Sequence, residues 1–445
     1  MYSNNKNLII IGFIYLISFI YICNGNALDI FIDLKSNNGD AVCGGALSPC
    51  GSFSQAGDRI RSTTPSSFDQ LNVYVLNRGS SVIQVNSQTQ YFGEINQFES
   101  ILITVAESST PSKPVASLPK IQINGNGNQD QVFITTFGNV KLQGFIFNDF
   151  DTLVATGDED RFVNLQLEAN QFNKLSKISG IQSGQDPDSK EDDFIINSKS
   201  VSIIGCKFTD SQRVNVLKSN CPGKVEIKGS SFEYGGSTFR FNESSSLLIQ
   251  DSQFTFSLRS KYQTGIFEFS LPSEVYFEGT NFTNSNSEFR SLLKITEPND
   301  RGDTNITIKN ISYNQENGVS ENGYIIGLYH DGYVYFTMRN SQITHNSDPR
   351  DVANLVYFSG RRQYPYFLTM ENNNSTFFYN SLVYSEGYIK VKIFNNIFIG
   401  KEAVIGPHYT LDTDFVPFSS EASLNSIWSY SFVILSSLIL LIKSL

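Results

Sequence analysis

Six asparagines stand in the N-x-S/T pattern, in which the side-chain amide nitrogen accepts an N-linked glycan. They are Asn242, Asn281, Asn305, Asn310, Asn373 and Asn374. We expect Asn281 and Asn305 to point outward, because the residues that follow them, Phe282 and Ile306, are inward positions of the repeat described below. Asn310 falls at a predicted turn, where a stacked asparagine would be buried by its neighbours. We therefore predict lower glycan occupancy at Asn310 than at Asn281 or Asn305.

Cysteine chemistry is the second feature. The chain has five cysteines, of which Cys23 lies in a predicted signal peptide. An even number in an exported protein indicates disulfides, and the remaining four allow three connectivities. Pairing Cys43 with Cys50 and Cys206 with Cys221 closes two short loops, and we favour it on that ground.

Other residues that could carry chemistry form weaker patterns. The acidic stretch 185–193 departs from the EF-hand template, with Lys190 at a ligand position and no glycine for the turn. The histidines lack a ligand spacing; they are His330, His345 and His408. The tripeptide Arg301-Gly302-Asp303 matches an adhesion signal, but three residues recur too often by chance to count. We predict no metal, no cofactor and no catalytic residue.

The N-terminal segment indicates export. Lys6 precedes an apolar run from Leu8 to Ile22, and a stretch of small residues ends at Ala27. This order is typical of a secretory signal peptide, which we place at residues 1–27. An N-terminal anchor helix is the alternative.

A second apolar run, residues 427–442, follows a short polar spacer at 419–426. At about 1.5 Å per residue it reaches roughly 24 Å, short of the roughly 30 Å hydrocarbon core of a membrane. We favour a glycolipid-anchor (GPI) signal, with a tilted transmembrane helix as the alternative. Residues 28–418 form the predicted extracellular domain.

Composition bounds the class of protein. The formal net charge is −10, charged residues make up 17% of the chain, and no basic run occurs. Nucleic acid is therefore not an expected partner. Phe, Tyr, Ile and Asn are abundant and strong helix formers are scarce, which indicates β structure.

One pattern recurs ten times between residues 140 and 398. Two apolar residues alternate, a turn residue follows two positions later, and an inward apolar residue closes the unit, as in Val201, Ile203, Gly205 and Phe208. One copy carries two extra residues before its closing Phe377. The ten turn positions are Gly144, Ala169, Gly205, Gly229, Asp251, Gly279, Asn310, Asn340, Asn372 and Asn395.

Gly, Asn and Asp adopt a left-handed backbone at low cost, so the chain can bend sharply at nearly all of these positions. Stacked copies would pair their strands in parallel and bury columns of Ile, Val and Phe. We predict about thirteen such coils in a rod roughly 60 Å long.

The N-terminal third has strand-like runs at 30–34, 71–76, 101–105, 121–123 and 132–135. Phe53, Ala56 and Ile60 share one helical face, which predicts a short helix just after Cys50. An open solenoid end exposes apolar core and unpaired strands, so a cap is required there.

Two segments, 118–133 and 140–147, are similar to the first coils of right-handed parallel β-helix proteins of the pectin-lyase-like superfamily. Residues 43–60 resemble the cysteine-framed capping helix of its extracellular members, a non-catalytic cell-surface type found in social amoebae. The likeness covers most of residues 30–400. It implies an all-β fold, a right-handed parallel β-helix solenoid with a short N-terminal capping helix. The superfamily spans enzymes, adhesins and phage tailspikes, so the resemblance implies no single function.

The polygalacturonase, lyase and esterase motifs of that superfamily are not recognisable. Outward positions of the repeat form two rows, and glycoside hydrolysis needs two carboxylates about 5–9.5 Å apart. Neither row places acids on adjacent coils. The first row reads Lys141, Gln166, Ser202, Glu226, Leu248, Tyr276, Thr307, Thr337, Thr369 and Lys392; the second reads Gln143, Glu168, Ile204, Lys228, Gln250, Glu278, Lys309, Arg339, Glu371 and Phe394.

We therefore expect a non-enzymatic cell-surface glycoprotein on the extracellular side of the plasma membrane. Its expected role is adhesion, glycan recognition or a surface coat, with glycans or neighbouring surface proteins as partners. The alternative is a polysaccharide-active lyase or glycoside hydrolase, with a site built wholly from loops.

Overall fold

The structure, a computed structural model, describes residues 27–417 with gaps between strands. The gaps are 36–41, 64–67, 80, 87–90, 109–119, 127–130, 156–162, 181–192, 197–199, 212–215, 221–222, 235–237, 243–245, 257–266, 270–273, 285–290, 298–302, 316–322, 331, 346–350, 361–365, 407 and 413–415. Residues 1–26 of the predicted signal peptide, the spacer and the C-terminal tail lie outside the described residues. Within the described part, no helix is long and apolar enough to cross a membrane.

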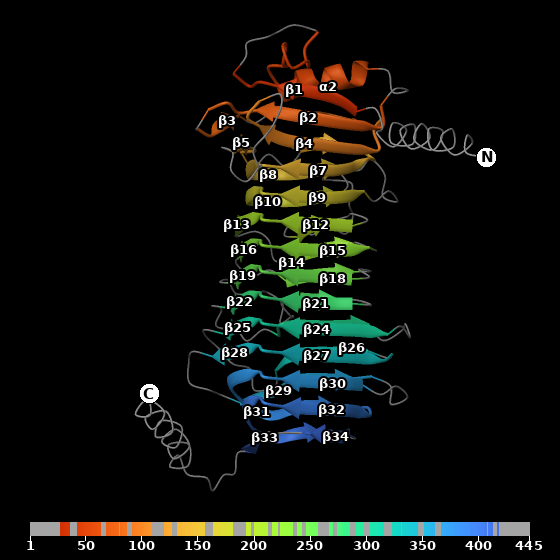
Figure 1. Cartoon of the computed structure of the whole chain (residues 1–445), viewed down its shortest axis with the longest axis vertical. Helices are drawn as coiled ribbons and strands as arrows, with labels where there is room; N and C mark the ends of the chain where they lie inside the picture. The colour runs from red at the N-terminus through yellow and green to blue at the C-terminus, as the bar shows by residue number, and fades with distance from the viewer. Residues whose placement is uncertain are drawn as a thin grey trace, which may run out of the picture.

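Fourteen strands form one parallel sheet, here named sheet A, in which each strand comes from a successive coil of the chain (Figure 1). Its strands are β1 (Ala27–Ile32), β2 (Gln70–Leu76), β4 (Ser100–Ala106), β7 (Asn139–Gln143), β9 (Asn164–Glu168), β12 (Ser200–Ile204), β15 (Lys224–Lys228), β18 (Ser246–Gln250), β21 (Glu274–Glu278), β24 (Thr304–Lys309), β27 (Val334–Arg339), β30 (Tyr366–Glu371), β32 (Ile389–Phe394) and β34 (His408–Asp412).

The other strands pair in parallel from coil to coil along the remaining sides of the stack. They are β3 (Ile83–Val85), β5 (Ile121–Asn124), β6 (Val132–Thr135), β8 (Phe145–Ala155), β10 (Gln171–Gly180), β11 (Asp193–Ile196), β13 (Lys207–Ser211), β14 (Val216–Asn220), β16 (Ser231–Tyr234), β17 (Thr238–Asn242), β19 (Gln253–Phe256), β20 (Phe267–Phe269), β22 (Asn281–Asn284), β23 (Leu293–Glu297), β25 (Ser312–Gln315), β26 (Tyr324–His330), β28 (Gln342–His345), β29 (Asp351–Ser359), β31 (Asn374–Ser385), β33 (Ile397–Ile405) and β35 (Val416–Pro417). The chain is all-β with stacked parallel sheets, an arrangement consistent with a parallel β-helix.

The predicted turns form the corner after each sheet A strand. All ten predicted turn residues have a positive φ, between 48° and 84°. Ala169 shares this backbone with φ 52°, although alanine pays a steric cost there. Each turn redirects the chain out of sheet A, and this confirms the repeat as the unit of the coil.

The predicted inward positions are buried. Val201, Ile203 and Phe208 are at most 2% exposed, and they pair in parallel with their equivalents in adjacent coils. The closing phenylalanines stack with ring centroids 4.5 to 5.7 Å apart; they are Phe147, Phe172, Phe208, Phe232, Phe254 and Phe282. Stacked rings thus form a continuous column through the core.

One copy of the repeat differs from its prediction. Ser375, not Phe377, occupies the closing position, because it pairs with Ile343 of the preceding coil and is buried. Its hydroxyl lies 2.7 Å from the hydroxyl of Tyr379. The extra residues form an irregularity after the closing position, where the register with β33 shifts.

A column of small polar side chains, here named the corner ladder, runs inside the stack just after each turn. Its members are Asn170, Cys206, Ser230, Ser252, Thr280, Ser341, Asn373 and Asn396, with Ile311 interrupting it. The Ser230 hydroxyl accepts the backbone N–H of Cys206 at 3.1 Å, and the side-chain oxygen of Asn373 accepts that of Ser341 at 3.0 Å. The ladder thus satisfies backbone groups that the sharp corners remove from the strand pairing.

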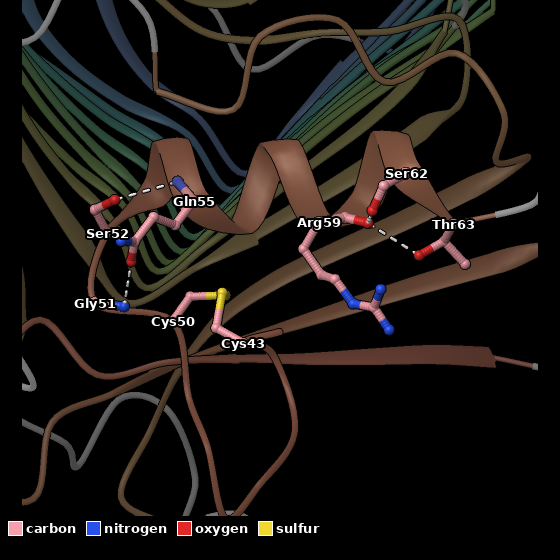
Figure 2. The surroundings of a disulfide bond; sticks show 8 residues. All are labelled: Cys43, Cys50, Gly51, Ser52, Gln55, Arg59, Ser62 and Thr63. Atoms are coloured by element: carbon pink, nitrogen blue, oxygen red, sulfur yellow. Dashed lines mark hydrogen bonds between the residues drawn. A yellow bond between two sulfur atoms is a disulfide. The ribbon is translucent and has the colours of Figure 1, made fainter. Parts of the chain in front are cut away.

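The N-terminal end of the stack is capped as predicted. Helix α2 (Phe53–Ser62) lies across it and buries Phe53, Ala56 and Ile60. The Ser52 side chain accepts the backbone N–H of Gln55 and so begins the helix (Figure 2). The predicted Cys43–Cys50 disulfide is present beside the helix.

Candidate functional site

The outward face of sheet A carries the two predicted rows of side chains. The parallel register places each row member beside its equivalent on the next coil, as in Gln166 beside Ser202 and Thr337 beside Thr369. The same register continues to β4, β2 and β1 on the N-terminal side. A long, regular face of polar residues therefore follows the axis of the stack.

Each carboxylate of the two rows is engaged by a neighbouring side chain. Glu168 accepts from Gln143 at 2.6 Å and pairs with Lys141 at 3.0 Å. Glu226 pairs with Lys228 at 2.5 Å. The remaining two contacts are Glu278 with Tyr276 at 2.8 Å and Glu371 with Arg339 at 3.1 Å. These carboxylates pair with other groups and not with one another.

The environment keeps three of these carboxyls ionised. Burial raises the pKa of Glu168, but hydrogen bonds from Lys141 and Gln143 outweigh burial and hold that pKa below its usual range. The contact with Lys228 lowers the pKa of Glu226, and the Tyr276 hydroxyl lowers that of Glu278. A general acid for glycoside hydrolysis needs a raised pKa, so none of the three suits that role.

A shallow groove of about 390 Å³ lies on this face across β2, β4, β7, β9 and β12. Four short side chains of one row line it, Ser100, Asn139, Asn164 and Ser200. The same row continues with Lys224, Ser246, Glu274, Asn305, Tyr335 and Phe367. Amides line much of it: Gln70, Asn72, Asn139, Asn164 and Gln166. The side-chain oxygen of Asn139 accepts the Asn164 backbone N–H at 3.0 Å, and the Ser200 hydroxyl donates to the side-chain oxygen of Asn164 at 2.7 Å.

Amides and hydroxyls both donate and accept hydrogen bonds. A groove lined by them matches the alternating donors and acceptors of sugar hydroxyls. The repeat predicted Gln166 and Ser202 as outward residues, but the row before them, which includes Asn139 and Asn164, was not predicted. That row stands immediately before the first apolar residue of each repeat, and its position was the available signal.

The C-terminal part of the same face is aromatic and basic. The rings of Tyr335 and Phe367 stack with centroids 4.9 Å apart and planes at 7°. The Lys390 ammonium lies 5.2 Å from the centre of the Phe367 ring, and Lys392 lies 4.9 Å from that of Phe394. The two ends of sheet A therefore offer different chemistry.

The predicted glycosylation sites divide by exposure. Asn281, Asn305 and Asn374 are exposed, which confirms the outward direction predicted for the first two. Asn310 is exposed as well, so the prediction that it is buried is wrong. The predicted low glycan occupancy of Asn310 rested on that burial. The left-handed turn directs Asn310 outward and its successor Ile311 inward. Asn242 ends β17, and its side chain lies outside the described residues.

Asn373 is unsuited to carry a glycan in the folded protein. It is 1% exposed, and its side-chain nitrogen donates to the Met338 carbonyl at 2.9 Å. That nitrogen is the atom a glycan would occupy. Of the two overlapping sequons, only that of exposed Asn374 remains a candidate.

The second predicted disulfide is not formed. Cys206 is a free, buried thiol within the corner ladder, and Cys221 lies outside the described residues. Cys206 points inward because it directly follows the left-handed Gly205. Burial raises the pKa of its thiol to about 12, so it stays protonated and unreactive.

The histidines, the acidic stretch and the Arg-Gly-Asp tripeptide were the weaker candidates in the sequence. His330 is buried, with one ring nitrogen 3.0 Å from the Thr304 hydroxyl and the other accepting the Gly332 N–H at 2.8 Å. Among the described residues no group of His, Cys, Asp or Glu has the arrangement of a metal site. Asp303 is exposed, whereas Arg301, Gly302 and the acidic segment 185–192 lie outside the described residues.

No protein-family model, no curated protein and no solved structure matches this chain. The groove, the engaged carboxylates and the sequence features of the two ends therefore carry the evidence for function.

Proposed function

We propose that the protein is a non-enzymatic cell-surface glycoprotein that recognises glycans with the groove on sheet A. The groove supports this proposal because five amides and three hydroxyls line it, among them Asn164, Gln166 and Ser202. Its one lysine, Lys141, already pairs with Glu168. The rest of the lining is uncharged, and it combines amides and hydroxyls with the apolar surface of Leu102, which suits the hydroxyls and the C–H groups of neutral sugars.

The engaged carboxylates favour binding over catalysis. Hydrolysis of a glycosidic bond requires one protonated and one ionised carboxyl on opposite sides of that bond. Glu168, which pairs with the groove residue Lys141, is held ionised by Lys141 and Gln143. The proposed role is display of a rigid rod for adhesion or a surface coat.

Membership of the right-handed, pectin-lyase-like β-helix superfamily is part of the proposal. Parallel coils, a buried aromatic column and a disulfide beside a capping helix support it. Export through the predicted signal peptide and attachment by a glycolipid complete it. Release of the protein from intact cells by a phosphatidylinositol-specific phospholipase would support the glycolipid; retention would favour a transmembrane helix.

A glycan array combined with turnover assays tests the function. The purified glycosylated chain is screened for binding, and each bound polysaccharide is assayed for new reducing ends and unsaturated products. We expect saturable binding without turnover. Sustained turnover would instead support the enzyme.

Paired variants locate the binding surface. Replacing Asn164 and Gln166 by alanine removes two amides from the groove, and we expect affinity to fall about tenfold or more, since each lost hydrogen bond is worth about 1 kcal/mol. Thr337→Ala changes the same outward row far from the groove and should leave affinity unchanged. Equal affinities for all three proteins would rule out the groove.

A further inference from the structure

Two exposed sequon asparagines lie beside exposed apolar side chains of the next coil. Asn305 on β24 is in register with Tyr335 on β27, and Asn374 on β31 is in register with Ile397 on β33. Tyr335 is 41% exposed and Ile397 is 65% exposed, whereas most large apolar side chains in the described part of the chain are buried. The proposed groove lies on other coils, so it does not account for this pairing.

The geometry at Asn305 turns one face of a partly exposed aromatic ring toward that asparagine. Tyr335 stacks on Phe367, and their planes are within 7° of parallel. Phe367 belongs to the coil beyond Tyr335, and Asn305 belongs to the coil before it. The ring face of Tyr335 away from Phe367 is therefore turned toward the coil of Asn305, about 4.8 Å away.

A pyranose ring suits the face of Tyr335 that is turned toward Asn305. Sugar rings present C–H groups on one side, and the electron-rich face of an aromatic ring attracts such polarised hydrogens. The first sugar of an N-linked glycan is attached directly to the asparagine nitrogen, so it starts at the rim of the Tyr335 ring. Ile397 offers Asn374 an apolar surface of similar position but without the aromatic attraction.

We propose that N-linked glycans on Asn305 and Asn374 fold onto the next coil, where the first sugar covers Tyr335 and Ile397. In the transfer step the amide nitrogen forms the glycosidic bond, the lipid diphosphate leaves the oligosaccharide donor, and the amide loses one proton. The proposal rests on the export that the proposed function includes. It gives the exposed ring and the exposed isoleucine a definite occupant.

Asn281 supplies a matched contrast. It is exposed like Asn305, but its partners in adjacent coils are Gln253 and Ser312. Neither offers an apolar surface. A glycan on Asn281 therefore extends into solvent. It reports on glycosylation at a site where the first sugar has no apolar surface to contact.

Chemical modification of tyrosine tests the proposed contact between the Asn305 glycan and Tyr335. The full chain is produced in the secretory pathway of a eukaryotic cell, nitrated with tetranitromethane and analysed by peptide mass spectrometry. We expect Tyr335 to be nitrated several-fold faster in Asn305→Gln than in the unaltered protein. Tyr388 is 50% exposed and serves as the internal control, with equal nitration in both proteins. Asn281→Gln should leave nitration of Tyr335 unchanged.

Release of the glycans by a peptide N-glycosidase tests the same contact through the glycan. We expect Tyr335→Ala to speed release from Asn305 several-fold and Ile397→Ser to speed release from Asn374, with release from Asn281 unchanged in both.

Three outcomes would overturn the proposal. The first is equal nitration of Tyr335 with and without the Asn305 glycan, and the second is a glycan on Asn281 with none on Asn305. Absence of glycans from every sequon would overturn the proposal together with the export on which it rests.

Discussion

Ala169 has the left-handed backbone that glycine has at the same corner of other coils. Its φ is 52°, and that of Gly229 is 54°. A β-carbon added to the exposed Gly229 meets nothing within 4 Å, whereas Ala169 is buried. Exchanges at these two corners therefore measure how much a β-carbon at a left-handed φ changes the free energy of unfolding.

We predict opposite effects for exchanges at these two corners. Ala169→Gly should raise the free energy of unfolding by about 0.5–1 kcal/mol, because relief of a left-handed alanine outweighs the added freedom of the unfolded chain. Gly229→Ala should lower it by about 1 kcal/mol for the reverse reason. Urea denaturation of both variants checks the signs; a loss of stability in Ala169→Gly would contradict the strain at this corner.

The Cys206 thiol should make the free energy of unfolding depend on pH only in the alkaline range. Burial raises its pKa from 9.0 to about 12, so the folded protein binds this proton more tightly than the unfolded chain. The resulting stability is complete below pH 9 and is lost as the pH rises toward 12. In Cys206→Ser we expect a smaller loss of stability over this range, and near-equal stability at pH 7 because serine suits the corner ladder. Thermal unfolding from pH 7 to 11 measures the difference.

Alkylation of the same thiol separates a free cysteine from a disulfide. Without reductant, Cys206 should resist iodoacetamide in the folded protein and react in urea. Failure to react in urea would support the pairing of Cys206 with Cys221.

At the scale of elements, alternating residues predicted the strands but not the corner ladder. Alternation puts Val201 and Ile203 on one face, and the structure confirms both as buried. A single left-handed residue then interrupts the alternation, so that the turn residue points outward and the next residue points inward. This shift explains why Asn310 is exposed while Cys206 and Asn373 are buried. Serine, threonine and asparagine recur just after the turns, and that recurrence was the overlooked signal.

Neighbouring asparagines allow a matched test of the corner ladder. Asn373→Ala removes the partners of the Ser341 N–H and the Met338 carbonyl, so we expect a loss of about 3 kcal/mol in the free energy of unfolding. Asn374→Ala alters an exposed position and should change it by less than about 0.5 kcal/mol once glycans are removed from both proteins. Similar losses in the two variants would show that the ladder contributes little.

At the scale of the whole molecule, the repeat predicted the length of the stack closely. Fourteen strands of sheet A at about 4.8 Å span about 62 Å, near the rod predicted from thirteen coils. The last strand, β34, lacks the apolar alternation, so the sequence did not reveal it. The groove was also not predictable, because it depends on side chains being short in several adjacent coils at once.

The N-terminal end depends on a loop that the Cys43–Cys50 disulfide closes. This loop covers the edge of sheet A, where the Phe31 N–H donates to the Gly44 carbonyl and the Cys50 N–H donates to the Phe31 carbonyl. Above it, α2 packs so closely that a β-carbon on Gly57 would lie 2.3 Å from the Phe92 carbonyl oxygen. Loop, helix and first coils therefore form one cap.

Removing the disulfide should loosen this cap and leave the far end of the stack intact. Replacing both cysteines by serine frees an eight-residue loop, which costs about 2.5 kcal/mol by the chain-entropy relation. Coils of a solenoid contact only their neighbours, so the loss should fade along the axis. In hydrogen exchange followed by mass spectrometry, we expect faster exchange in β1, β2 and β4 and unchanged exchange in β24, β27 and β30. Gly57→Ala should give the same gradient with the disulfide intact. Uniformly faster exchange along the rod would mean that the stack unfolds as a single cooperative unit, and the cap would then protect every coil equally.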